Sequence, residues 1–440
     1  MYSLNDTVLE SNTYSKINFN GGDLSSDAGL LLIKEFVNKM GIEQLINQMF
    51  HTNDSAIRWH KDDENLLQVM YQIISAYFED DCADELTKDP VFTSILNKPS
   101  LASQPTLSRF YNRMDEGTLA QLNQINRELR RRVYAHQKPE MALLDLDSTL
   151  LATYGKQEGE AFNYHYQAHG YHPLLCYDGL TGDLLRIQLR NGTDYCCNGV
   201  CDFLQPLLDE YLNDYSDVNV FLRGDSGFAS PELYTQCETN GVTYAIRLKY
   251  NAALWRLAAD LDSELTDLTK DNMVDYAVVY GEFYYQAGSW EYPRRVVCKI
   301  EKPADQMIHM YTFIVTNMEL TPEDVIKYYC NRGRMENFIK EGKLGFDFAA
   351  VSSRSAIVNA NRLLIHALAY NIFNWFRRLA LPEKMRGNLV DTIRLKLLKI
   401  AARVVRSARY VTFKLCSSCP YKGEFYETLE NIRKLKPRMA

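Results

Sequence analysis

In one stretch of the sequence, five residues at regular spacing place a single carboxylate among three cations and a phenol. These residues are Tyr329, Arg332, Glu336, Lys340 and Lys343. They recur at intervals of three or four positions, which predicts one face of a helix. The carboxylate can bind a divalent cation, and the cations can bind phosphate groups. The pattern therefore indicates phosphodiester chemistry, although a solvated helix face of mixed charge has the same appearance.

Two further stretches end apolar strands with aspartates. Asp145 and Asp147 lie in the run 143–149, and Asp225 lies in the run 220–227. Because Asp145 and Asp147 are two residues apart, they share one strand face, and either can point into a site. Three carboxylates from two strands and a helix can hold two divalent cations. Hard oxygen ligands suit Mg2+, with Mn2+ as a substitute.

The elements that must position these residues alternate between strands and helices. Apolar and β-branched runs predict three strands, a helix, a strand, a helix and a strand. Their ranges are 141–146, 171–177, 184–189, 200–212, 218–223, 231–239 and 243–248. This is the order of a ribonuclease-H-like α/β core. In that fold the first and fourth strands are neighbours, which would bring Asp145 and Asp147 beside Asp225.

A β insertion separates this core from the Glu336 helix. Residues of about 250–322 contain three runs rich in aromatic and β-branched side chains, at 278–285, 295–300 and 310–315. After Glu336 the pattern predicts a long buried helix at 359–376 and a basic amphipathic helix at 389–409. We therefore expect a catalytic domain at 136–440 whose basic helical tail covers about 355–440.

The N-terminal part, residues 1–135, reads as a helical domain for DNA binding or dimerisation. A helix-turn-helix over 85–113 would bring Arg109 and Arg113 to a DNA groove. The alternative is that these helices only pack on the catalytic domain or on a second protomer.

Charge is distributed unevenly along the chain. The 440 residues carry a net charge of −7, but residues 354–440 contain 18 Lys or Arg and only 5 Asp or Glu. Such asymmetry favours a polyanionic partner for the basic tail, and DNA in particular. The alternative is a tail that docks on the acidic remainder of the chain.

The composition is that of a globular protein, with 46% hydrophobic and 24% charged residues. No basic and then apolar leader is visible at the N-terminus, and no apolar run is long enough for a membrane span, so an intracellular protein without a membrane partner is expected. The ten cysteines are expected to be reduced. Cys416 and Cys419 have metal-ligand spacing but no second pair nearby, which argues against a structural zinc.

With these motifs the chain resembles the DDE transposases of the IS4-like superfamily, and the IS1380 group of bacterial insertion sequences in particular. The spacing of Tyr329, Arg332, Glu336 and Lys343 is similar to the superfamily's Y-x2-R-x3-E-x6-K signature. The runs 147–149 and 224–228 resemble its two aspartate motifs. The runs 21–29 and 169–174 also look like IS1380 sequence.

The resemblance implies catalytic and metal-binding roles for Asp147, Asp225 and Glu336, with Asp145 as an alternative first carboxylate. It implies two Mg2+ ions, cleavage of phosphodiester bonds at the element ends, and transfer of the 3′-OH ends into target DNA. Tyr329, Arg332, Lys340 and Lys343 would contact the DNA. The family further implies a homodimer in the synaptic complex and a bacterial, cytoplasmic, nucleoid-associated protein. Trp290 could stack on a flipped base, but ordinary sheet packing is the simpler interpretation.

Two other functions fit parts of the sequence. The run 145–149 matches the D-x-D-x-T motif of haloacid-dehalogenase-like phosphatases, in which Asp145 would attack phosphorus and Asp147 would act as acid and base. A domesticated, non-catalytic DNA-binding protein is the other alternative, although its carboxylates would not need to be intact.

Overall fold

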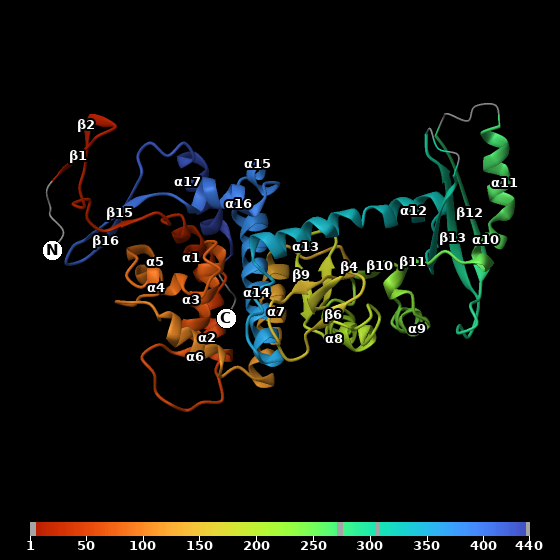
Figure 1. Ribbon diagram of the computed structural model, residues 1–440, viewed down its shortest axis with the longest axis horizontal. Coiled ribbons are helices and arrows are strands. Elements are labelled where there is room, and N and C mark those ends of the chain that lie inside the picture. The colour runs from red at the N-terminus through yellow and green to blue at the C-terminus, as the bar shows by residue number, and fades with distance from the viewer. Residues whose placement is uncertain (1–5, 271–275, 305, 307, 437–440) are drawn as a thin grey trace. The chain divides into compact units, whose positions relative to one another are not determined.

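The computed structural model describes residues 6–270, 276–304, 306 and 308–436 (Figure 1). The described chain divides into two compact units. Unit 1 contains the described residues up to His136, together with Lys343–Ala350 and the residues from Leu364 onward. Unit 2 contains Gln137–Gly342 and Val351–Leu363. The division at 136 lies beside the expected domain boundary, but most of the expected basic tail belongs to the unit that holds the N-terminal helices.

An eight-stranded mixed sheet forms the centre of unit 2. Its order is β12-β13-β14-β11-β10-β4-β8-β9. The strands are β4 (Met141–Ser148), β8 (Leu174–Asp178), β9 (Leu184–Gln188), β10 (Asn219–Gly224), β11 (Thr243–Leu248), β12 (Ala277–Tyr285), β13 (Arg294–Lys302) and β14 (Met310–Thr316). β10 pairs in parallel with both β4 and β11, which confirms that the first and fourth predicted strands are neighbours. β4 is buried from Ala142 to Leu146, as expected for a central strand with both faces covered.

The predicted strand at 171–177 is two strands in different sheets. β7 (Ala168–Tyr171) pairs with β5 (Leu151–Ala152) and β6 (Ala161–Asn163) in a small separate sheet, whereas β8 begins at Leu174. Pro173 lies between them and has no N–H to donate to a ladder. The chain therefore leaves one sheet before it enters the next.

The three strands predicted at 278–285, 295–300 and 310–315 are present as β12, β13 and β14, and they extend the main sheet. β14 pairs antiparallel with β11, and β13 and β12 follow outward. The helices α10 (Ala252–Leu257) and α11 (Ala259–Leu268) accompany these strands, and α11 packs against β12 and β13 (Figure 1). The predicted helices between the core strands are α8 (Val200–Asp214) and α9 (Pro231–Thr239), with the short 3-10 helix η1 (Ser226–Phe228) after β10.

The signature stretch is not one continuous helix. α12 (Pro322–Cys330) ends before Arg332, and α13 (Gly333–Gly345) begins after it. The backbone bonds across the break, such as Arg332 N–H to the Tyr329 carbonyl at 3.0 Å, span three residues rather than four. Asn331 and Gly333 are both weak helix formers, which explains why the helix breaks there. The single helical face predicted for residues 329–343 is therefore wrong.

Unit 1 is mostly helical. Its N-terminal helices are α1 (Leu30–Lys39), α2 (Ile42–Met49), α3 (Asp62–Ile74), α4 (Cys82–Glu85), α5 (Pro90–Ile95), α6 (Gln104–Tyr111) and α7 (Glu116–His136). The later ones are α14 (Ala356–Ala380), which begins in unit 2, α15 (Glu383–Arg386), α16 (Val390–Ile393), the π-helix η2 (Arg394–Leu398) and α17 (Lys422–Lys434). Arg394 is buried at the core of this unit, where it donates to the carbonyls of Ile73 and Ile74 at 2.9 and 2.8 Å. No helix within the described ranges is long and apolar enough to cross a membrane.

The basic helix predicted at 389–409 is also wrong. The helical segment formed by α16 and η2 ends at Leu398. The chain then continues as β15 (Ala402–Arg406) and β16 (Val411–Leu415), which form a hairpin beside β3 (Leu24–Ser25). The carbonyls of Leu398 and Ile400 accept from the N–H groups of Gly29 and Ala28 at 3.1 and 3.0 Å, which takes the backbone out of the helix. Two more strands, β1 (Thr7–Leu9) and β2 (Asn12–Ile17), precede the expected helices.

Candidate active site

Asp145 is held in an ion pair inside the sheet. Arg223 lies directly opposite on β10. Its Nε donates to Oδ1 of Asp145 and its Nη2 to Oδ2, both at 2.7 Å. Both side chains are buried, and Arg223 also donates to the Tyr328 carbonyl at 2.7 Å. Burial raises the pKa of Asp145, and the guanidinium opposes that shift. A phosphatase nucleophile needs an oxygen that reaches the substrate, and this buried pair offers none.

Asp147 lies one pleat further along β4, at the wall of a cavity. Its carboxylate pairs with Arg332 at 3.2 Å and accepts the Ser148 N–H at 2.8 Å. Burial raises its pKa to about 6, against the lowering effect of Arg332. The negative charges of Asp225 and Glu336 add to the increase. These three carboxylates, which come from distant parts of the sequence, are therefore close enough to interact.

Asp225 follows the last residue of β10 and caps η1. Its Oδ1 accepts the Gly227 N–H at 2.7 Å. A Cβ on Gly227 would lie 2.9 Å from the Cys196 side chain, so the turn needs glycine there. Because β10 is parallel to β4, the carboxyl ends of the two strands meet at one edge, and both aspartates line the same cavity.

Glu336 lies in the first turn of α13 and is exposed. It is not part of the cavity wall. In the part of the chain that the structure describes, no three His, Cys, Asp or Glu side chains are grouped closely enough to hold a metal ion. The donor chemistry nevertheless suits Mg2+, since all three groups are carboxylates. The mutual repulsion that raises the pKa of Asp147 is also what a bound cation would relieve.

The other four side chains of the signature stretch, those of Tyr329, Arg332, Lys340 and Lys343, differ in burial and in their contacts. Arg332 donates to the Leu146 carbonyl at 2.6 Å in addition to its pair with Asp147. Tyr329 packs against a cluster of buried residues, and burial raises its pKa. Lys340 is exposed, whereas burial lowers the pKa of Lys343. Among these side chains, Arg332 contacts the candidate carboxylate Asp147 directly.

The cavity beside the two aspartates has a volume of about 540 Å3 and an aromatic wall. Three exposed tyrosines contribute to it: Tyr164, Tyr166 and Tyr195. Lys249 also lines the cavity, and its Nζ donates to the Tyr195 hydroxyl at 2.9 Å. Such a wall can stack on bases and bind phosphate. These residues were not predicted from the sequence, although the aromatic run at 162–166 is a signal for such a wall.

The remaining sequence candidates lie elsewhere. Trp290 is buried and packs edge-on against Tyr234 and Tyr285, with ring centroids 5.3 Å apart in each pair. This is the ordinary sheet packing expected from the sequence. In unit 1, Arg113 is paired with Asp62 at 2.6 Å, which leaves it less available to DNA than predicted. Arg109 is exposed on α6.

Comparison with known proteins identifies the class. A family model described as "Transposase DDE domain group 1" matches residues 9–437. The chain therefore belongs to this family of transposases. A search of the curated proteins finds no match.

Among solved structures, the chain is similar to the piggyBac transposase in a cryo-EM synaptic complex with hairpin DNA. The sequence identity is 13%, the TM-score is 0.40, and the match covers 94% of this chain and 86% of that chain.

Proposed function

We propose that this transposase binds the terminal inverted repeats of its own element, cleaves phosphodiester bonds at the ends, and transfers the 3′-OH ends into target DNA. One observation carries the proposal. Asp147 near the end of β4 and Asp225 just after the end of the adjacent parallel strand β10 lie at the wall of one cavity, and Glu336 is near enough to raise the pKa of Asp147. The family assignment supports the same reaction class.

The sheet supports a ribonuclease-H-like core. Its strands β9, β8, β4, β10 and β11 combine an antiparallel meander with two parallel crossovers, in the order expected for that fold. We infer that β12, β13 and β14 are an insertion added at the β11 edge. In this arrangement, β4 and β10 bring two of the carboxylates to one end of the sheet.

Asp147 and Asp225 would hold Mg2+, two ions in all, and Glu336 would complete the ligand set. Bound Mg2+ would activate the attacking oxygen and stabilise the leaving one. Asp147 rather than Asp145 is the first carboxylate in this proposal, because both oxygens of Asp145 already accept from Arg223.

The chain's own cations and aromatics would position the DNA. Arg332 holds Asp147 in place and presents a guanidinium to the scissile phosphate, for which a planar, permanent cation is well suited. Partial burial of the Tyr166 hydroxyl, which donates to the Ser148 carbonyl at 3.4 Å, and the negative charge of Asp147 raise its pKa to about 12, so the phenol stays protonated. Lys249 and the tyrosines of the cavity wall would bind the strand end beside the cut.

We also propose that two copies act together. Both ends of an element must be cut and joined to one target, and each chain offers a single set of these carboxylates. The DNA partners are thus the two terminal repeats and the target.

The test is cleavage of labelled duplexes that carry the repeats flanking the gene. Asp225→Asn should abolish Mg2+-dependent cleavage without loss of binding, whereas the matched surface change Asp202→Asn on α8 should leave both unchanged. Binding without cleavage by the wild-type protein would instead favour a domesticated DNA-binding protein. Cleavage by Asp225→Asn at the wild-type rate would contradict the proposal.

A further inference from the structure

The β15–β16 hairpin, residues 402–415, concentrates positive charge on an exposed ribbon. Residues 392–423 contain eight Lys or Arg and no Asp or Glu. Four of these cations lie on the hairpin and are exposed: Arg403, Arg406, Arg409 and Lys414. None of the four forms an ion pair with any residue that the structure describes.

Two of these cations face each other across the ladder. Arg403 is the direct partner of Lys414 in the antiparallel register. Like charges in this position destabilise a hairpin. Near the tip, Arg406 precedes the turn, and Arg409 lies within it, 5.3 Å from the Tyr410 ring. The hairpin thus carries a repulsion that a polyanion on its outer face would relieve.

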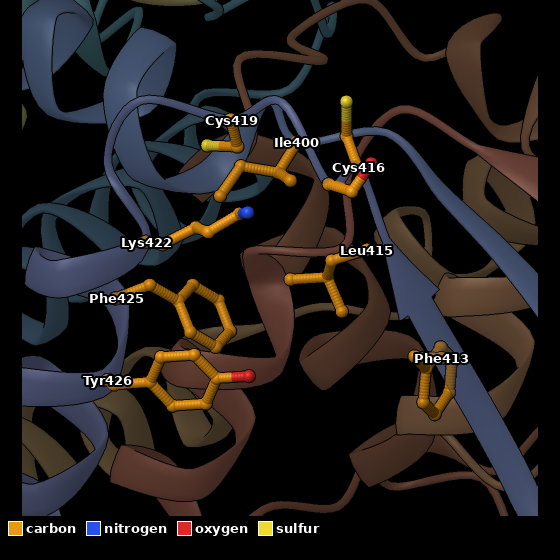
Figure 2. A pocket seen from close by; sticks show the side chains of 9 residues that line it. Ile400, Phe413, Leu415, Cys416, Cys419, Lys422, Phe425 and Tyr426 are labelled. Atoms are coloured by element: carbon orange, nitrogen blue, oxygen red, sulfur yellow. The ribbon is translucent and has the colours of Figure 1, made fainter.

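The other face fixes the hairpin to unit 1. Val404 and Ala402 are buried, and Val404 N–H donates to the Asp23 carbonyl at 2.8 Å. Leu415 of β16 and Phe425 of α17 face each other in a pocket of about 320 Å3 (Figure 2). One face of the ribbon is therefore anchored, while its cations remain exposed.

The base of the hairpin is fixed by a second set of contacts. Lys399, just before β15, pairs with the buried Asp27 at 2.6 Å and lies 4.0 Å from the Tyr77 ring. A Cβ on Gly29 would lie 1.6 Å from the Leu397 carbonyl oxygen, so glycine allows the chain before α1 to approach η2. These contacts hold the start of the ribbon in one position.

We propose that the β15–β16 hairpin is a DNA-binding ribbon that lies in a groove of duplex DNA. A two-stranded ribbon fits the major groove of B-form DNA, and exposed arginines without carboxylate partners suit phosphate contacts. This inference rests on the proposed function for the identity of its partner. It adds a binding surface that lies outside the carboxylate site.

The test compares the full-length Arg406→Gln/Arg409→Gln variant with Lys88→Gln/Lys434→Gln, which removes two exposed charges elsewhere in unit 1. Binding to a labelled duplex of random sequence is measured over a range of salt concentrations. The tip variant should bind about tenfold more weakly, and its salt slope should decrease by about 0.9 for each lost phosphate contact. The control should keep most of the wild-type slope. Equal losses in the two variants would overturn the assignment to the hairpin.

Lys414→Gln separates binding from folding. It removes the like-charge pair, so the metal- and DNA-free protein should melt at the same or a higher temperature while binding to DNA weakens. A lower melting temperature with unchanged binding would mean a structural role only and would overturn the proposal. Equal hairpin dependence for an A-form RNA duplex, whose major groove is too narrow for a ribbon, would overturn the groove-binding mode.

The outcome is separable from that of the catalytic proposal. Asp225→Asn should retain hairpin-dependent binding without cleavage, whereas the tip variant should still cleave at saturating protein concentration.

Discussion

Asp145 and Arg223 stand directly opposite each other on adjacent parallel strands and form a two-point ion pair closed to solvent. The same strand places Asp147 two residues later at the wall of the cavity. Asp145 thus links β4 to β10 inside the sheet, whereas Asp147 reaches the candidate site at the carboxyl end of β4. Asp145 and Asp147 share one face of β4, but only Asp147 is at the cavity wall.

Breaking the Asp145–Arg223 pair should therefore cost stability. Arg223→Met leaves a buried carboxylate without its partner, so the free energy of unfolding should decrease by about 3–5 kcal/mol, as measured by chemical denaturation. Lys138→Ala, which removes an exposed pair with Asp217, should cost about 1 kcal/mol or less. A loss at Arg223 as small as that at Lys138 would contradict the structural role.

Replacing Asp147 should increase stability, in contrast to breaking the Asp145–Arg223 pair, and the size of the increase should depend on pH. Its pKa in the folded, metal-free protein is about 6, above the ordinary value of 3.8. The folded state therefore binds the proton more tightly than the unfolded state, and stability is lost as the pH rises through about 6. Asp147→Asn mimics the protonated form. In the presence of a chelator at pH 8, the free energy of unfolding of this variant should exceed that of the wild type by up to about 3 kcal/mol.

The gain from Asp147→Asn should shrink as the pH falls below 6 and vanish below about 4. Urea unfolding at several pH values provides the measurement. The variant should also fail to cleave DNA at every pH. A gain that is constant across this range would contradict the assigned titration.

Arg332 should matter for cleavage more than for folding. Arg332→Gln removes the cation beside Asp147, so the cleavage rate should fall on the order of 10²-fold, as for other preorganised charge-stabilising donors. Arg332→Lys should recover only part of the rate, because Nη2 alone contacts both Asp147 and the Leu146 carbonyl, and a lysine lacks the further N–H groups with which the planar guanidinium can bind phosphate. Single-turnover cleavage separates this effect from weaker DNA binding. Full activity of Arg332→Gln would rule out the proposed role.

Gly29→Ala tests the contact between the chain before α1 and η2. Its Cβ would meet backbone rather than a flexible side chain, so we expect a loss of about 1–3 kcal/mol in the free energy of unfolding. The matched control is Gly423→Ala, where the added methyl meets nothing within 4 Å on α17. That change should stabilise the protein by about 0.5–1 kcal/mol, since alanine is the better helix former. Thermal and denaturant unfolding should give opposite signs for the two variants.

Much of unit 2 could be predicted from local patterns. Apolar runs of strand length, with helices between them, were enough to predict that β4 and β10 would be neighbours. The Asp145–Arg223 pair was not predictable, because it depends on the register between two strands 78 residues apart. The cavity wall was missed for a similar reason, since it combines loops around Tyr164, Tyr195 and Asp225.

Two helix predictions failed, one for a local reason and one because of contacts with a distant part of the chain. Between Cys330 and Gly333 the periodicity continues, but weak helix formers break the helix. After Leu398, contacts with Ala28 and Gly29 redirect a basic, β-branched stretch into a hairpin. Periodicity alone contains no information about such distant partners.

The most direct test of the account is Mg2+-dependent cleavage of end-labelled DNA carrying the element's repeats, with Glu336→Gln compared against wild type. Glu323→Gln, a matched change on the exposed face of α12, serves as the control. We predict cuts at the repeat boundary by wild type and Glu323→Gln, and none by Glu336→Gln despite equal binding. Cleavage by Glu336→Gln at the wild-type rate would contradict the assignment of Asp147, Asp225 and Glu336 as one catalytic set.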